Sequence, residues 1–191
     1  MRIATLVVGL AASGCGRIAF DPVEVAADAP PVSFVRPLSP RGTFLRPELD
    51  TPAELASLEP PLIVRLADEG IVPGRTLYLE QRGGFDYTGN GRDEGHLLGL
   101  FSTSDVVLDP AQPARVPGAI DAGEDTVTVH DIAEDFDIAF LWFRPDPSPR
   151  NGNGVEVVVP EGAVYLMVAF VDSLYRDNGD DPDLAVAIAG R

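Results

Sequence analysis

Short apolar runs separated by turn-forming residues make up the chain from about residue 61 onward. Eight such runs can be traced: Leu62–Leu66, Thr76–Leu79, Leu97–Phe101, Thr126–His130, Ile138–Phe143, Val155–Val159, Val164–Val171 and Leu184–Ile188. Proline and glycine supply 18 and 19 of the 191 residues, which favours strands and loops over long helices. We therefore predict an all-β domain over residues 61–191, a two-sheet antiparallel β-sandwich that is jelly-roll-like and has about eight strands.

The N-terminal residues have the pattern of an export signal. A positively charged start precedes an apolar run, Ile3–Ala12, that is too short to span a bilayer. The string Ala12-Ser13-Gly14-Cys15 then resembles the lipobox of bacterial lipoproteins, in which the signal is cut before a lipidated cysteine. The resemblance implies a signal peptide over 1–14 and lipidation of Cys15. Because Gly16 is not aspartate, it also implies an outer-membrane lipoprotein of the cell envelope. The alternative is an ordinary secretory signal.

Residues 15–60 are predicted to be a lipidated cysteine followed by a proline-rich tether. Nine of the 18 prolines lie between residues 16 and 61, a density that disfavours both helices and central strands. One helical turn is expected at Thr51-Pro52-Ala53-Glu54, since threonine can cap a helix and proline suits its first position. We interpret the segment as a spacer that holds the domain off the membrane.

Charge and motif content narrow the function classes. The formal net charge is −16, so the chain is expected to be repelled by nucleic acid, and we predict no such partner. Nucleophile-elbow, zinc-protease and phosphate-loop motifs are all absent from the sequence. We therefore predict that the protein is not an enzyme. A hydrolase that uses paired carboxylates such as Asp135 and Asp137 is the weaker alternative.

Acidic residues are dense near the C-terminus, where Arg176 is the only opposing charge among Asp172, Asp177, Asp180, Asp181 and Asp183. Such a cluster disfavours a compact fold unless solvent or a cation relieves the repulsion. Carboxylate, amide and carbonyl oxygens are the ligands that Ca²⁺ takes. The cluster therefore indicates either a solvated acidic loop or a calcium site.

The order of apolar runs and polar residues around this cluster is a more specific signal than the acidic charge alone. The pair Asp177-Asn178 follows the apolar run Val164–Val171, and the string Gly84-Phe85-Asp86-Tyr87 follows the earlier run Thr76–Leu79. Over about residues 61–190, this arrangement resembles the calcium-dependent galactose-binding bacterial lectins. Members of that family are small β-sandwiches that bind Ca²⁺ between two loops, and sugar hydroxyls complete the shell of the ion.

The resemblance implies a set of site residues. Metal ligands would be the side chains of Asp172, Asp177 and Asn178 and the main-chain carbonyls of Tyr87 and Tyr175. Carbohydrate contacts would involve Asp172, Asp177 and His96. The loop from Asp172 to Asp177 is shorter than in the lectins, and no sugar-selecting pair can be placed between Thr88 and His96.

We therefore expect Ca²⁺ as the cofactor, a glycan as a possible partner and the membrane as a partner through the N-terminal lipid. The alternative is a structural or adhesive envelope module that has at most a structural calcium ion and no sugar site. The oligomeric state stays open.

Overall fold

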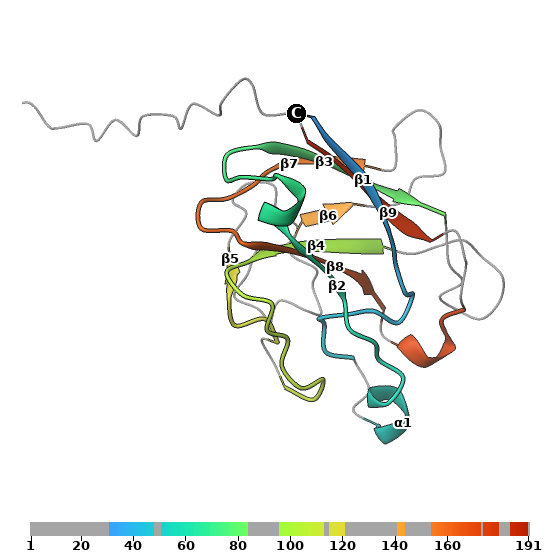
Figure 1. Ribbon diagram of the computed structural model, residues 1–191. Helices are drawn as coiled ribbons and strands as arrows, with labels where there is room; N and C mark the ends of the chain where they lie inside the picture. The colour runs from blue at the N-terminus through green and yellow to red at the C-terminus, as the bar shows by residue number, and fades with distance from the viewer. Residues whose placement is uncertain are drawn as a thin grey trace, which may run out of the picture.

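A computed structural model of the chain describes residues 31–47, 51–83, 96–112, 115–120, 141–143, 154–172, 174–179 and 184–190. Two antiparallel sheets face each other in it, so the predicted all-β, two-sheet sandwich is confirmed (Figure 1). No helix in these ranges is long and apolar enough to cross a membrane.

Each sheet is built from strands that are distant in sequence. The first sheet has the order β1 (Val32–Pro37), β9 (Ala185–Gly190), β3 (Thr76–Arg82), β7 (Gly154–Val158). The second has the order β2 (Leu62–Arg65), β8 (Tyr165–Val171), β4 (His96–Ser102), β5 (Ala119–Ile120), and β6 (Leu141–Phe143) also pairs with β4. The helical elements are α1 (Pro52–Leu55) and the 3₁₀ turns η1 (Leu66–Glu69) and η3 (Tyr175–Asp177).

Most of the predicted strands are present. Six of the eight predicted runs coincide with β2, β3, β4, β7, β8 and β9, and β6 covers the end of a seventh. The predicted run Thr126–His130 lies outside the described residues. Strands β1 and β5 were not predicted, because β1 lies in the proline-rich segment and β5 is only two residues long.

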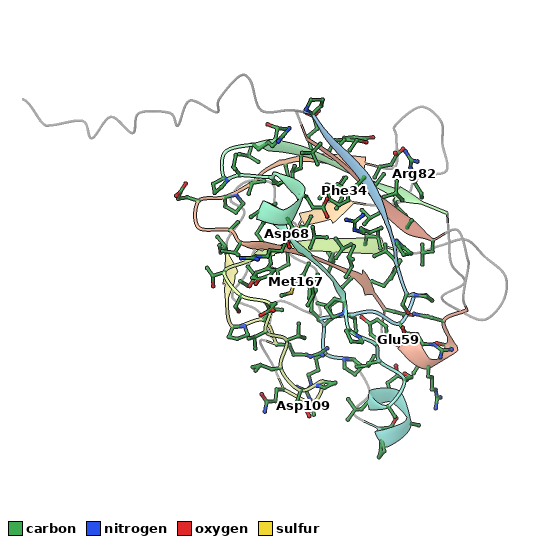
Figure 2. All side chains as sticks on the ribbon, in the orientation of Figure 1. Phe34, Glu59, Asp68, Arg82, Asp109 and Met167 are labelled. Carbon is green, nitrogen blue, oxygen red and sulfur yellow. The ribbon has the colours of Figure 1, made fainter. Side chains whose placement is uncertain are left out.

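The main core lies between the sheets, where inward-facing side chains alternate along each strand. Leu77 and Leu79 of β3 face Leu166, Val168 and Phe170 of β8, and all of these side chains are almost fully buried. Their period of two is the pattern that places every second residue on one face of a sheet. Figure 2 shows the side chains filling the space between the two sheets.

A second core covers the outer face of the second sheet. The intervening residues of β4 and β8 include Leu98 and Met167, of which Met167 is labelled in Figure 2. They pack there against Phe44, Leu45 and Val116. Both β4 and β8 are therefore buried on two faces. This burial explains why their sequences are nearly continuous apolar runs rather than alternating ones.

Some of the residues that cover the outer face of the second sheet come from the segment that was predicted to be a tether. Strand β1 pairs with β9 along its whole length, and Phe44 and Leu45 are 0% and 1% exposed. Residues 31–47 and 51–60 are thus part of the sandwich, and the predicted domain start at residue 61 is wrong for them. The predicted tether up to residue 30 lies outside the described residues.

The prolines in this segment occupy positions that tolerate them. Pro37 closes β1, which is an edge strand, and Pro52 opens α1. An edge strand and the first turn of a helix can both lack a backbone N–H donor. The predicted helical turn is confirmed, because Thr51 Oγ1 accepts a hydrogen bond from the backbone N–H of Glu54 at 3.2 Å.

The strand register defines two ends of the sandwich. At one end, which we call the entry end, Val32 at the start of β1 lies opposite Gly190 at the finish of β9. At the other, which we call the loop end, Pro37 and Arg82 both lie opposite Ala185. Strand β4 also starts at the loop end, with His96 opposite Val171.

Candidate functional site

The loop that joins β8 to β9 carries most of the predicted ligands and lies at the loop end. It leaves β8 after Val171, forms the 3₁₀ turn η3 and returns to β9 at Ala185. Helix α1 lies beside η3 (Figure 1). The predicted site therefore faces parts of the chain, residues 38–47 and 51–58, that sequence reasoning assigned to the tether.

Tyr175 fixes the loop from inside the core. Its side chain is fully buried, and its hydroxyl donates to the carbonyl of Phe170 at 2.9 Å. The hydroxyl also lies 3.1 Å from Thr43 Oγ1 and accepts a bond from the N–H of Asp172 at 3.3 Å. The phenol of Tyr175 thus has a structural role in holding the loop, and only the main-chain carbonyl of Tyr175 could serve as the predicted ligand.

Asn178 is the most informative residue of the predicted set. It is 1% exposed, and its amide nitrogen donates to the carbonyl of Pro40 at 2.7 Å. A flipped amide would place two acceptors together, so this bond fixes which atom is the oxygen. The Oδ1 atom is buried, and it has no hydrogen-bond partner within the described part of the chain. An oxygen ligand is therefore held on the side of the amide away from Pro40.

The two predicted carboxylates differ in environment. Asp172 is half-buried, and its Oδ1 accepts a bond from the N–H of Leu174 at 3.3 Å, whereas Asp177 is exposed. Across the described ranges, no three residues among histidine, cysteine, aspartate and glutamate are grouped to hold a metal ion. A cation here would thus depend on the amide of Asn178 and on main-chain oxygens as well as on the carboxylates.

Positive charge also approaches this loop. Arg41 Nη2 donates to the main-chain carbonyl of Asn178 at 3.2 Å, and the side chain of Arg176 is half exposed on η3. These guanidinium groups offset part of the acidic charge that the sequence places in the loop. The carbonyl of Asn178 is consequently engaged by the protein itself.

Glu54 lies next to the candidate site, and sequence reasoning missed it. Its side chain is fully buried, Oε1 accepts a short hydrogen bond from the N–H of Tyr175, and Oε2 lies 3.9 Å from Arg176 Nε. Its position in the predicted helical turn was found, but that pattern indicates a capping role. Nothing in the local sequence shows that the carboxylate reaches a loop that is more than a hundred residues away.

The remaining predicted site residues can be placed only in part. Tyr87 and Cys15 lie outside the described residues. His96 begins β4 opposite Val171, so its backbone lies next to the start of the candidate loop. Gly83 follows β3 at the loop end, so both flanks of the segment that contains Tyr87 are at the same end as Asp172.

Comparison of the chain with protein-family models, with curated proteins and with solved structures gave no match. The interpretation of the loop end therefore rests on the chemistry and geometry of its residues.

Tyr175 gives this loop a testable pH dependence. Burial raises the pKa of the Tyr175 phenol above its ordinary value of about 10, because the phenolate would lose its hydration. In the unfolded chain the phenol ionises near pH 10, while in the folded chain it keeps its proton. The unfolded state then binds fewer protons, so the stability contributed below pH 10 is lost as the pH rises further.

We expect the free energy of unfolding to fall above about pH 10, by up to about 1.4 kcal/mol per pH unit from this group. Urea melts between pH 8 and about pH 11.5 measure the slope. In Tyr175→Phe this part of the slope should disappear, although the variant loses a hydrogen-bonding hydroxyl at every pH. An unchanged alkaline slope in Tyr175→Phe would contradict the assignment.

Proposed function

We propose that the protein is a lipid-anchored module of the bacterial cell envelope, an outer-membrane lipoprotein that binds Ca²⁺ at the loop end and, through the ion, a glycan. The observation that carries this proposal is the buried Oδ1 atom of Asn178, which has no hydrogen-bond partner among the described residues. A buried acceptor in this state costs about 1–3 kcal/mol unless another group pairs with it. A hard cation is such a group.

The chemistry of the neighbouring residues fits calcium. Ca²⁺ takes six to eight oxygen ligands, including carboxylates, amides and backbone carbonyls. The proposed set is the side chains of Asp172, Asp177 and Asn178 with the carbonyls of Tyr175 and Tyr87. About five protein oxygens would leave roughly two positions of a seven-coordinate ion for solvent or sugar hydroxyls. His96 is proposed as an additional contact to the sugar.

The anchor is proposed from the sequence around Cys15. Several acyl chains on one cysteine would bury enough methylene groups for stable attachment to a membrane. A single shallow sugar site binds weakly, and an array of anchored copies would raise its effective affinity. The proposal thus combines a weak site with a surface that makes it multivalent, and it includes no catalytic step.

Calcium should stabilise the fold. At a free concentration 100 times the dissociation constant, Ca²⁺ is expected to raise the free energy of unfolding by about 2.7 kcal/mol. Thermal melts in excess Ca²⁺ and in EDTA measure this effect, and Asp177→Ala should abolish the difference. Asp68→Ala is the matched control, because Asp68 is an exposed carboxylate on η1 (labelled in Figure 2) outside the proposed set. Identical wild-type melts in both buffers would contradict the metal site.

A second candidate function is favoured by the hydrogen bonds that hold the loop between β8 and β9 in place. Glu54 accepts the N–H of Tyr175. The side-chain amide of Asn178 donates to the carbonyl of Pro40, and Arg41 donates to the main-chain carbonyl of Asn178. In this candidate the module is structural or adhesive, and any calcium ion only ties loops together.

A glycan array separates the two candidates. If the ion bridges to sugar, a multivalent form of residues 31–191 should give hits in Ca²⁺ that disappear in EDTA, because hydroxyl groups replace waters on the ion. The Asp177→Ala form should give none in either buffer. An array without hits, together with stabilisation by Ca²⁺, would favour the structural candidate.

A further inference from the structure

The place where the chain enters the sandwich determines which end is far from an anchor at Cys15. Strand β1 starts with Val32 opposite Gly190, so the segment that follows Cys15 joins the sandwich at the entry end. Residues 16–30 are fifteen residues and reach at most about 50 Å when fully extended. The entry end is therefore the end of the sandwich that lies closest to Cys15 along the chain.

The candidate site lies at the opposite end. Strand β1 runs six residues, about 17 Å, from the entry end to the loop end. Helix α1 and the turn η3 lie beyond that point, as Figure 1 shows. Every residue of the proposed calcium set that the structure describes lies in the loop between β8 and β9, so the set is separated from the point of attachment by the length of the sandwich.

Charge also disfavours contact between the sandwich and the membrane. The whole chain has a net charge of −16. A strongly acidic body is repelled by an anionic lipid surface, so it gains nothing electrostatically by lying against one.

We infer that the loop end is presented away from the membrane that anchors the protein, so that its ligand is a glycan on an opposing surface rather than a sugar headgroup of the same membrane. The inference rests on the proposed function, since it needs both the lipid on Cys15 and the site at the loop end. It adds the source of the glycan, which neither the lipobox nor the calcium set specifies.

Two variants of the full lipidated chain, each with one introduced cysteine, test this geometry. Ala53→Cys places a thiol on exposed α1 at the loop end, and Glu161→Cys places one in the exposed turn after β7 at the entry end. Cys15 is the only native cysteine, and lipidation blocks it, so a donor dye reacts only with the introduced thiol. The protein is reconstituted into phosphatidylethanolamine–phosphatidylglycerol vesicles that contain an acceptor-labelled lipid.

Energy transfer to the lipid should be stronger from position 161 than from position 53. Equal transfer, or stronger transfer from position 53, would overturn the inference even though the protein is anchored. Flotation of the same samples distinguishes a wrong orientation from the absence of a lipid anchor. A chain that does not float with the vesicles, or that reacts with dye at Cys15, contradicts the anchor and therefore the proposed function itself. Neither measurement needs calcium or a sugar, so a negative glycan array does not affect the result.

Discussion

Phe44→Ala is expected to lower the free energy of unfolding by about 3–5 kcal/mol and the melting temperature by about 10 °C. Phe44 is completely buried in the second core, where it packs on the outer face of the β4–β8 pair. Truncation to alanine removes most of a large side chain from that interface and leaves a cavity. Urea and thermal melts of residues 31–191 measure the loss.

The result tests the placement of residues 31–47 in the fold rather than in a spacer. In a spacer, Phe44 would be solvated in both states, and its replacement would change stability by less than about 0.5 kcal/mol. Val106→Ala is the matched control, because Val106 is a 45% exposed hydrophobic residue in the loop after β4. If Phe44→Ala has the same stability as Val106→Ala, the packing of Phe44 in the second core is contradicted.

Neighbouring bonds explain why this part of the chain can be ordered despite its prolines. Arg115 is buried, and its guanidinium donates to the carbonyl of Leu45 at 2.7 Å, of Leu108 at 3.0 Å and of Thr43 at 3.3 Å. The irregular backbone around Phe44 thus receives donors that no strand supplies. Such long-range pairing leaves no local pattern in a sequence.

Most strands of the sandwich could be predicted from the sequence, because each corresponds to a short apolar run. The apolar runs that form β3 and β8 are bounded by turn residues, so each strand can be recognised from residues that are close to it in the sequence. The same sequence contained a further clue. The run Val164–Val171 has no charged residue on either face, so something had to cover both faces of the strand. The proline density of residues 16–61 instead predicts a spacer, so the sequence alone does not identify Phe44 and Leu45 as the cover.

The candidate site was predictable only in its acidic half. Asp172 and Asp177 stand out as charges between two apolar runs, and the structure places both in the loop between β8 and β9. The groups that shape this loop come from far away in the chain. Pro40 fixes the amide of Asn178, and Thr43 meets the hydroxyl of Tyr175. Contacts at such separations are set by the packing of the whole sandwich, which no short pattern encodes.

Glu54→Ala is expected to be the most damaging change at the loop end, with a loss of about 3 kcal/mol in the free energy of unfolding. The fully buried carboxylate accepts the N–H of Tyr175, and a hydrogen bond to a charged group is worth about 1.5–3 kcal/mol. Alanine leaves that N–H unpaired in the interior and also removes buried methylene groups. Glu59→Ala is the control, since Glu59 is an exposed glutamate close by in sequence (labelled in Figure 2) and should change stability by less than about 0.5 kcal/mol.

Glu54→Gln separates hydrogen bonding from charge at this position. Glutamine keeps an acceptor oxygen for the N–H of Tyr175 and removes a buried charge whose nearest cation, Arg176, is 3.9 Å away and half exposed. Burying a charge is costly, so Glu54→Gln should lie within about 1 kcal/mol of the wild type. If Glu54 acts by holding the loop in shape, calcium titration should show about tenfold weaker binding in Glu54→Ala, a difference of about 1.4 kcal/mol, and nearly wild-type binding in Glu54→Gln. Equal weakening in both variants would instead mean that the negative charge itself attracts the ion. Wild-type affinity in both would mean that the proposed calcium site does not depend on this contact.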